Sequence, residues 1–251
     1  MKLYHELAEY YFAIEEAHRD ISADVSLIRS ITAHAASPSI LDLGCGTGEH
    51  LGLLASLGFN CTGIDSSEDM LAVATTRNRS PNISFSRQDM LDFDFYEQFD
   101  LVTCLFGSFD YLLEDVDVDR VLWNTWRSLK PGGSGLFEIW NAVPVREIST
   151  KPMTTVSRTH YKNRTIERRR GFSLLVSAPR TVVEVRYVYV IDHGKGTETL
   201  RDKHMMRAFD RGEIERFVNE NGFELTGIYS NSAMEPYREN SNKIIIRFSK
   251  K

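Results

Sequence analysis

Short apolar runs separated by amphipathic stretches fill the first 140 residues of the chain. Runs of about four to eight apolar residues bounded by turn residues are typical of buried strands, and apolar residues at helical spacing indicate helices. Strands are predicted at residues 39–43, 60–64, 83–87, 100–105 and 135–140. Helices are predicted at residues 3–33, 48–57, 66–78 and 117–129. This alternation favours a doubly wound (Rossmann-like), mostly parallel α/β sheet.

The pattern changes near residue 150, where apolar and polar residues begin to alternate as they do in strands with one buried face. Four strands are predicted there, at residues 154–161, 165–177, 181–192 and 197–209. We expect them to form an antiparallel sheet inserted after the fifth strand of the main sheet. A helix from residue 210 to Asn221-Gly222 and strands at 223–229 and 243–249 then complete a seven-stranded sheet.

The chain is therefore predicted to be one domain over residues 1–251, with a helical cap at 1–35 and the inserted sheet at 150–209. Its 30 Lys and Arg residues are outnumbered by 35 Asp and Glu, for a formal net charge of −5. This balance argues against a general nucleic-acid binder, which needs clustered cations. The only basic run is 168–170, for which a solvated strand or turn is favoured over a phosphate grip.

Cys45, Cys61 and Cys104 all fall in or beside predicted strands. Reduced packing residues are favoured there over a disulfide set or a metal site, and no metal-ligand spacing is present. The N-terminus shows no signal peptide, and no apolar run approaches membrane-spanning length. We therefore expect a cytoplasmic protein without a metal, a membrane partner or a nucleic-acid partner.

A glycine-rich turn follows the first predicted strand, with the spacing Gly44-x-Gly46-x-Gly48. Glu49 occupies the position of the third glycine of a dinucleotide fingerprint, and its carboxylate would repel a pyrophosphate. No Lys follows Gly48, so the turn is not a phosphate-binding P-loop either. The pattern indicates a nucleoside ligand without phosphate groups.

Two acids beside this turn add to the description of the ligand. Asp65 ends the second strand at close to the ~20-residue offset of a ribose-binding acid, and its two oxygens can accept from a ribose diol. Asp42 precedes the turn, where a carboxylate can accept a hydrogen bond from an ammonium. A ligand with a ribose, a positive charge and no phosphate is inferred, and S-adenosylmethionine fits.

Residues 41–48 resemble the first motif of class I S-adenosylmethionine-dependent methyltransferases. Residues 64–71, 87–90, 99–104 and 129–133 resemble the later motifs of that family, in order. The resemblance covers about residues 38–140. It implies a Rossmann-like sheet, S-adenosylmethionine as the methyl donor, and methyl transfer as the activity.

A further resemblance, to deoxyamino-sugar N,N-dimethyltransferases, rests on residues 104–112, 183–187 and 202–204 and on Phe209. In that subgroup the inserted sheet covers the substrate side of the pocket, and the product is a dimethylated amine. Residues 145–170, where substrate contacts would lie, match poorly. The resemblance implies a small-molecule amine as the methyl acceptor.

The resemblance also implies roles for particular residues. Cofactor contacts are expected from Tyr11, Asp42, Gly44, Cys45, Gly46, Gly48, Asp65, Ser66, Met70, Asp89, Met90, Cys104 and Phe106. Substrate contacts are expected from Ser108, Phe109, Tyr111, Trp140, Asn141 and His160. For Met70 and Tyr11, plain packing is about as well supported, and for Tyr4 packing is favoured.

Three residues are candidates for a catalytic role: Tyr11, Glu138 and His204. Glu138 could hold an ammonium or take its proton, although a strand acid paired with an Arg is an equal alternative. His204 could equally pack or cap within the insert. A neutral leaving group requires no metal and no covalent intermediate, and alignment alone can lower such barriers by ~7–11 kcal/mol.

The leading hypothesis is a methyltransferase that acts on a small molecule, at an amine nitrogen. One alternative is an RNA or protein methyltransferase, but the chain lacks a basic docking face and has Leu105-Phe106-Gly107-Ser108 where an Asn-Pro-Pro-Tyr-type motif would follow strand four. Another alternative is a non-catalytic S-adenosylmethionine-binding protein. The identity of the acceptor is not encoded in any pattern, and a β-rich insertion leaves a homodimer open.

Overall fold

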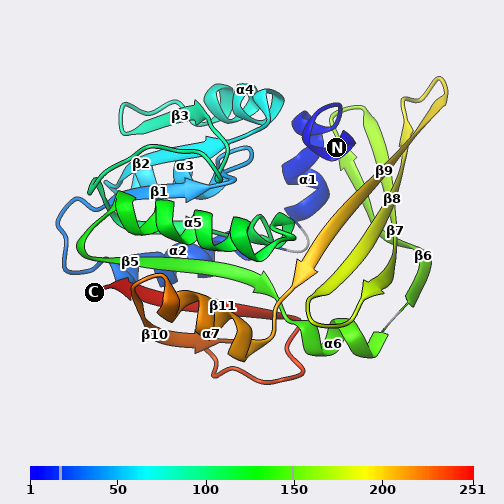
Figure 1. Cartoon of the computed structure of the whole chain (residues 1–251). Helices are drawn as coiled ribbons and strands as arrows, with labels where there is room; N and C mark the ends of the chain where they lie inside the picture. Colours follow the sequence, from blue (N-terminus) through cyan, green and yellow to red (C-terminus); the bar gives the residue numbers. More distant parts are fainter. Residues whose placement is uncertain (17–18, 149) are drawn as a thin grey trace.

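The computed structural model describes residues 1–16, 19–148 and 150–251, which form two sheets (Figure 1). The larger has seven strands in the order β10-β11-β5-β4-β1-β2-β3. The five strands from β3 to β5 run parallel, while β11 is antiparallel to both β5 and β10. The bounds are β1 Ser39–Leu43, β2 Asn60–Asp65, β3 Ile83–Arg87, β4 Phe99–Cys104, β5 Leu129–Trp140, β10 Phe223–Tyr229 and β11 Lys243–Lys250.

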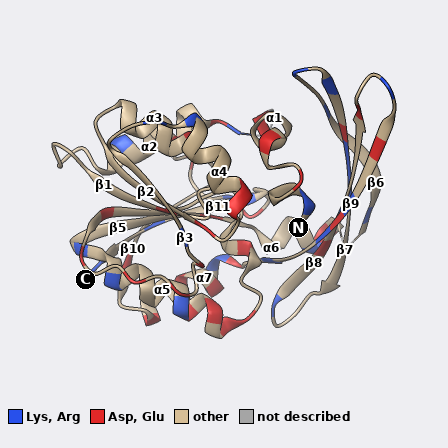
Figure 2. Ribbon diagram, turned by 90° about the horizontal axis from the view of Figure 1, so that it is seen from above, with Lys and Arg blue, Asp and Glu red and all other residues tan. Residues whose placement is uncertain are grey.

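Helices cover both faces of this sheet (Figure 2). One face carries α2 (Ile21–Ile31), α3 (Glu49–Ser56) and α4 (Glu68–Arg77); the other carries α5 (Asp115–Ser128) and α7 (Arg211–Glu220). Fully buried residues such as Leu51 on one face and Phe217 on the other close a core around the strands. The fold predicted from the sequence is confirmed, including the inserted sheet after the fifth strand.

The second sheet consists of β6 (Thr150–Tyr161), β7 (Arg164–Val176), β8 (Thr181–Asp192) and β9 (Thr197–Ala208), antiparallel and in that order. It faces the end of the main sheet at which β1 and β4 finish, and the N-terminal segment lies between the two sheets (Figure 1). Val185 and Tyr189 of β8 pack there against Leu7 and Ile14 in one apolar cluster. The N-terminal segment therefore packs between the two sheets and contributes to the core there.

The N-terminal segment is where the structure differs most from the sequence-based prediction. The single helix expected over 3–33 is wrong: the structure has short 3₁₀ turns η1 (Lys2–Tyr4) and η2 (Ala8–Tyr10), then α1 (Tyr11–Glu15), and then α2, which Asp20 caps. Residues 17 and 18 of that predicted helix lie outside the described residues. Apolar spacing of three to four residues fits 3₁₀ turns as well as an α-helix, so periodicity could not separate them.

Two further elements differ from expectation. The strand β5 begins at Leu129 rather than Gly135, because residues 131–133, which resemble a turn, are absorbed as an irregularity in the β4–β5 ladder. The short helix α6 (Ala142–Ile148) was not predicted. The solvated run expected at 168–170 is wrong for Arg168, which is 2% exposed and donates to Glu15 of α1. No helix among the described residues is long and apolar enough to cross a membrane.

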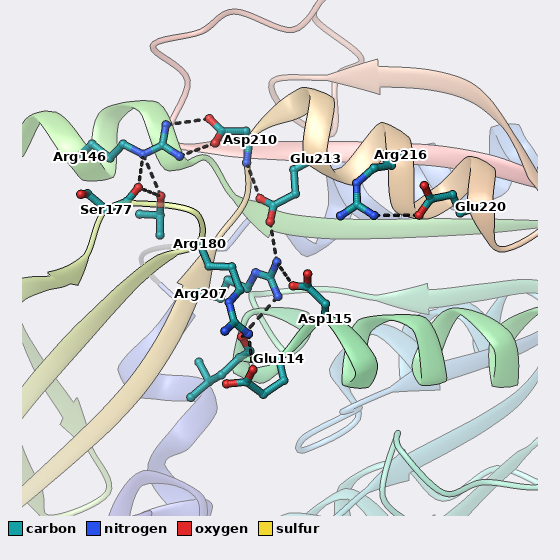
Figure 3. A network of polar contacts seen from close by, with 12 residues as sticks. Glu114, Asp115, Arg146, Ser177, Arg180, Arg207, Asp210, Glu213, Arg216 and Glu220 are labelled. Atoms are coloured by element: carbon teal, nitrogen blue, oxygen red, sulfur yellow. Dashed lines mark hydrogen bonds and ion pairs between the residues drawn. The ribbon is translucent and has the colours of Figure 1, made fainter.

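A buried arginine joins the inserted sheet to the main domain (Figure 3). Arg207, near the end of β9, is fully buried and donates to Asp115 of α5 at 2.7 Å and to Glu213 of α7 at 2.5 Å. Glu213 also completes the capping box of α7 with Asp210, to which Arg146 of α6 donates. The guanidinium therefore links three elements at the junction of the two sheets.

Removing this guanidinium should destabilise the fold. Arg207→Met keeps an apolar stem but leaves Glu213 and Asp115 without their cation, and we expect a loss of about 3 kcal/mol in the free energy of unfolding. Urea denaturation should show a lower midpoint at an unchanged m-value. Arg216→Met, which removes an exposed i,i+4 pair with Glu220, should cost below ~0.5 kcal/mol. Equal losses in the two variants would contradict this account.

Candidate active site

The glycine turn after β1 lies at the carboxyl edge of the main sheet, beside the end of β4. Gly44 and Gly46 have φ angles of +69° and +57°, in the left-handed region that favours glycine. A Cβ on Gly44 would lie 2.6 Å from Oγ of Ser108, which follows β4. The turn and the segment after β4 therefore approach each other closely enough that only a backbone without a side chain fits.

Asp65, at the end of β2, organises this turn. Its Oδ2 accepts from the backbone N–H of Gly46 at 2.9 Å, and its Oδ1 accepts from that of Ser67 at 2.8 Å. Burial raises the pKa of Asp65, which these two hydrogen bonds oppose. The N-cap of α4 is Ser67, so Asp65 does not cap this helix. Each carboxylate oxygen of Asp65 keeps acceptor capacity for a ligand.

A cavity of about 300 Å³ opens over this turn. Residues expected to contact cofactor or substrate line most of it: Tyr11, Gly44, Gly46, Asp65, Ser66, Met70, Asp89, Met90, Phe106, Ser108 and Tyr111. Tyr4 lines it as well, and so does Gln88, which the sequence did not single out. The structure therefore brings together, at one edge of the sheet, residues contributed by the N-terminal segment and by the segments that follow the first four strands.

A smaller recess adjoins this cavity and holds Asp42, Cys45 and Arg19. The Arg19 guanidinium lies 3.9 Å from the centre of the Phe106 ring and donates to the Tyr11 hydroxyl, while its buried Nε has no hydrogen-bond partner among the described residues. Sequence analysis missed Arg19, because nothing near it in the chain marks its role.

Asp42 accepts from Oγ1 of Thr103 at 2.6 Å. Burial raises the pKa of Asp42 to about 6, against the opposing effects of His50, Thr103 and Arg19. A nearby cation stabilises the ionised form of a buried carboxyl group, so the recess suits a cationic group of a ligand.

A second cavity, of about 740 Å³, lies between the end of β5, α6, the inserted sheet and the loop at 230–242. Glu138 and Trp140 line it, as expected for a substrate site, and Phe106 lines both cavities. Lys243 donates to Glu138 at 2.8 Å, so this strand acid is paired with a lysine rather than an arginine. Burial raises the pKa of Glu138, an effect that Lys243 opposes.

Five of the expected contacts do not lie at these cavities. Cys104, Phe109 and Asn141 have fully buried side chains and line neither cavity, so their ligand contacts stay predictions. Phe109 packs on Phe137 and Phe209, and the Asn141 amide donates to backbone carbonyls of the 230–242 loop, which it therefore shapes. Gly48 packs against Phe85, and His160 lies on the edge strand β6 beside Thr165.

His204 of β9 belongs to a chain of hydrogen-bonded side chains. Its Nδ1 lies 2.5 Å from the Tyr111 hydroxyl, which lies 2.9 Å from that of Tyr4, and its Nε2 lies 3.0 Å from Oδ2 of Asp202. Sequence analysis did not name Asp202 as a site residue, although the period of two in a strand places residues 202 and 204 on the same face. Burial raises the pKa of Tyr111 and Tyr4 well above the ordinary value and that of Tyr11 to about 12, so all three hydroxyls stay neutral.

Comparisons with known proteins agree with this geometry. Residues 40–133 match the methyltransferase domain family. The chain is 30% identical over 223 residues to a dTDP-3-amino-3,6-dideoxy-alpha-D-glucopyranose N,N-dimethyltransferase of Streptomyces fradiae, which covers 84% of this chain and 81% of that protein. This relative spans the inserted sheet as well as the main domain.

Solved structures show the same fold. An S-adenosylmethionine-dependent methyltransferase from Clostridium acetobutylicum superposes over 98% of both chains with a TM-score of 0.84 at 18% identity. An amino pentose methyltransferase from Micromonospora echinaspora, solved with S-adenosylmethionine bound, covers 92% of this chain and 90% of its own with a TM-score of 0.72 at 22% identity. With the cavity built by the glycine turn and Asp65, these matches establish that the chain belongs to the class I S-adenosylmethionine-dependent methyltransferases.

Proposed function

We propose that this methyltransferase methylates an amine nitrogen of a small molecule. The observation that carries the proposal is that two cavities meet at Phe106, one built around Asp65 and the other around Glu138. When bound, S-adenosylmethionine supplies an electrophilic methyl group on a sulfonium. The task of the protein is then to hold two ligands in line and exclude water, which a pair of adjoining cavities does.

The first cavity and its recess fit the methyl donor. Asp65 offers acceptors for a ribose diol, and Gly44 and Gly46 let backbone approach the ligand. In the recess, Asp42 suits an ammonium, and the unpartnered Nε of Arg19 suits a carboxylate. Met70 and Met90 supply apolar walls beside Asp89, which can accept from an adenine amino group. The donor set therefore matches a ribose, an amino acid and an adenine.

The side chains that line the second cavity suit a methyl acceptor that carries both an amine and an anionic group. Glu138 can hold an ammonium, and Trp140 offers an apolar wall beside it. Four cations also line the cavity, against the two carboxylates of Glu138 and Glu235: Lys151, Arg170, Arg238 and Lys243. A nucleotide-linked amino sugar, the substrate named for the Streptomyces fradiae relative, has this combination of charges.

The direct test is methyl transfer to dTDP-3-amino-3,6-dideoxy-α-D-glucopyranose, with bulk RNA and unstructured protein as competing acceptors. We expect dimethylated amine only with the sugar or a comparable small amine. Methylation of RNA or protein at an equal or higher rate would overturn the proposal. Tight S-adenosylhomocysteine binding without transfer to any small amine would favour a non-catalytic binding protein.

Loss of the ribose-binding acid should abolish donor binding. Asp65→Ala removes two charge-assisted acceptors, each worth about 1.5–3 kcal/mol, so we expect the Kd for S-adenosylhomocysteine to rise at least about 100-fold. Calorimetry measures this, and circular dichroism should show the fold intact. Glu68→Ala, which removes an exposed acid from the first turn of α4, is the matched control and should leave the Kd unchanged.

Donor binding should depend on pH through Asp42. Its pKa of about 6 means that the free protein carries a neutral carboxyl below pH 6, and a cationic ligand must then expel that proton. The affinity for S-adenosylhomocysteine should therefore be flat above this pH and fall up to about tenfold per pH unit below it. His50 and Arg19 line the recess, and Asp65 acts on Asp42 from the adjoining cavity, so Asp42→Asn is the control: it should bind weakly and with little pH dependence. If the affinity of Asp42→Asn falls with pH as steeply as that of the wild type, Asp42 is not the group that causes the pH dependence.

Neutralising Glu138 should affect the acceptor and not the donor. In Glu138→Gln we expect the acceptor KM to rise at least about tenfold, the loss of one hydrogen-bonded charge pair, with an unchanged Kd for S-adenosylhomocysteine. Steady-state kinetics and calorimetry measure the two quantities. Glu224→Gln on the exposed side of β10 is the control. A matching loss of donor affinity would place Glu138 in the donor site instead.

A further inference from the structure

A continuous hydrogen-bonded path leads from the donor cavity to a groove beside the inserted sheet. It begins at the Tyr111 hydroxyl, which lines the cavity beside Ser108 and Phe106. It continues through His204 to Asp202, with heavy-atom distances of 2.5 Å and 3.0 Å. The His204 and Asp202 side chains are 2% and 7% exposed, so the middle of the path is shielded from water.

The path ends at an open groove on the surface. Asp202 lines this groove, of about 620 Å³, together with Lys2, Arg201 and Lys203. The backbone N–H of Leu3 donates to the same Asp202 oxygen that His204 contacts, at 3.1 Å. The path therefore joins the donor cavity to an open, cation-lined groove through two buried side chains.

The directions of the hydrogen bonds follow from the chemistry of the groups. Burial acts to raise the pKa of Asp202, but the hydrogen bonds from His204 and Leu3 hold it below the ordinary value, so this group is an acceptor. Nε2 of His204 must then carry a hydrogen, and Nδ1 accepts from the Tyr111 hydroxyl. Because Tyr111 donates to His204, it accepts from Tyr4. One lone pair of the Tyr111 oxygen is left, on the side of the cavity.

We propose that Tyr111, His204 and Asp202 form a proton relay that takes a proton from the acceptor amine and delivers it to the surface groove. The proposal rests on the proposed function, because it needs an amine acceptor. In it the acceptor amine extends from the second cavity past Phe106 to the Tyr111 oxygen in the first, where the methyl donor is held. Tyr111 is then the catalytic residue, and His204 and Asp202 act through it.

The proton balance closes without any further reactant. An N–H bond of the ammonium breaks as its proton passes to the Tyr111 oxygen, while the Tyr111 proton passes to Nδ1 of His204. The amine is left neutral with a lone pair, and the imidazolium is balanced by the Asp202 carboxylate, as in other His–carboxylate pairs. The Nε2 proton then passes through Asp202 to water at the groove, which leaves His204 as the Nδ1–H tautomer. After the product leaves, the reverse transfer, in which Nε2 takes up a proton from the groove while the Tyr111 oxygen releases one to water in the donor cavity, restores the starting tautomer.

The surroundings of His204 favour this role. The groups that face it are Asp202 on its own strand, Tyr187 on β8, Tyr111 on η4 (Phe109–Tyr111) and Tyr4 on η1. At the end of the path in the groove, Lys2 and Glu198 add further charges. Asp202 is thus the charge nearest to the imidazole, and a carboxylate stabilises the cation that the relay must form. By contrast, the Tyr189 hydroxyl in the same cluster has no hydrogen-bond partner in the part of the chain that the structure describes.

The test combines kinetics with donor binding. With dTDP-3-amino-3,6-dideoxy-α-D-glucopyranose as the acceptor, Tyr111→Phe and His204→Gln should each lower kcat about 100-fold, typical of a lost general base. Acceptor KM and the Kd for S-adenosylhomocysteine should stay near the wild-type values. The kcat of both variants should also rise more steeply with pH than that of the wild type, because the solvent must then remove the proton. Tyr189→Phe, which deletes a hydroxyl from the same cluster, should match the wild type throughout.

A measurement without turnover separates this proposal from the proposed function. Nitrogen-15 correlation spectra of the S-adenosylhomocysteine complex should show His204 as the Nε2–H tautomer, and Asp202→Asn should alter that signal. An Nδ1–H tautomer, or variants with the pH profile of the wild type, would overturn the relay whatever the acceptor. The expected tautomer in a protein that methylates no amine would instead overturn the proposed function, and the relay with it.

Discussion

The position of the inserted sheet depends on one buried cation. Arg207 is fully enclosed between β9, α5 and α7, and its hydrogen bonds to Asp115 and Glu213 fix where β9 leaves the main domain. Both the second cavity and the hydrogen-bonded path through His204 lie between the two sheets. The size of the cavity and the distances along the path therefore depend on this junction. A guanidinium suits the position because its Nη2 donates to both carboxylates while its Nη1 donates to the backbone carbonyl of Leu113.

The edge of the main sheet concentrates carboxyl groups that burial makes costly to ionise. Asp42, Asp65 and Glu138 all have raised pKa values for the same reason, desolvation. Arg19 and Lys243 offset only part of that cost. A site arranged in this way gains from any ligand that brings positive charge, and both the sulfonium donor and an ammonium acceptor do so. The electrostatics of the site thus favour the ligands of the proposed reaction.

Local patterns predicted the strands well because each strand carries either a short apolar run or an alternation of apolar and polar residues. The bounds expected for 39–43 and 83–87 are those of β1 and β3, and the four strands of the insert were placed within a few residues. Prediction failed where the decisive contact is remote in sequence. Lys243 pairs with Glu138, and His204 meets Tyr111, over separations of 105 and 93 residues that no periodic pattern records. The broken N-terminal segment is a similar case, because its shape follows from the insert on which it packs.

Phe106 shows how the two cavities are kept in contact. It has a φ of +57° although it is not a glycine, a backbone state that costs about 1–3 kcal/mol and persists only where neighbours impose it. The Arg19 guanidinium on its ring at 3.9 Å and the His50 ring at 5.5 Å supply that constraint. The strained backbone aims the ring at the wall that both cavities share. Since Arg19 also faces the donor recess, a donor that engages it would tighten the same contact, and binding in one cavity would set the shape of the other.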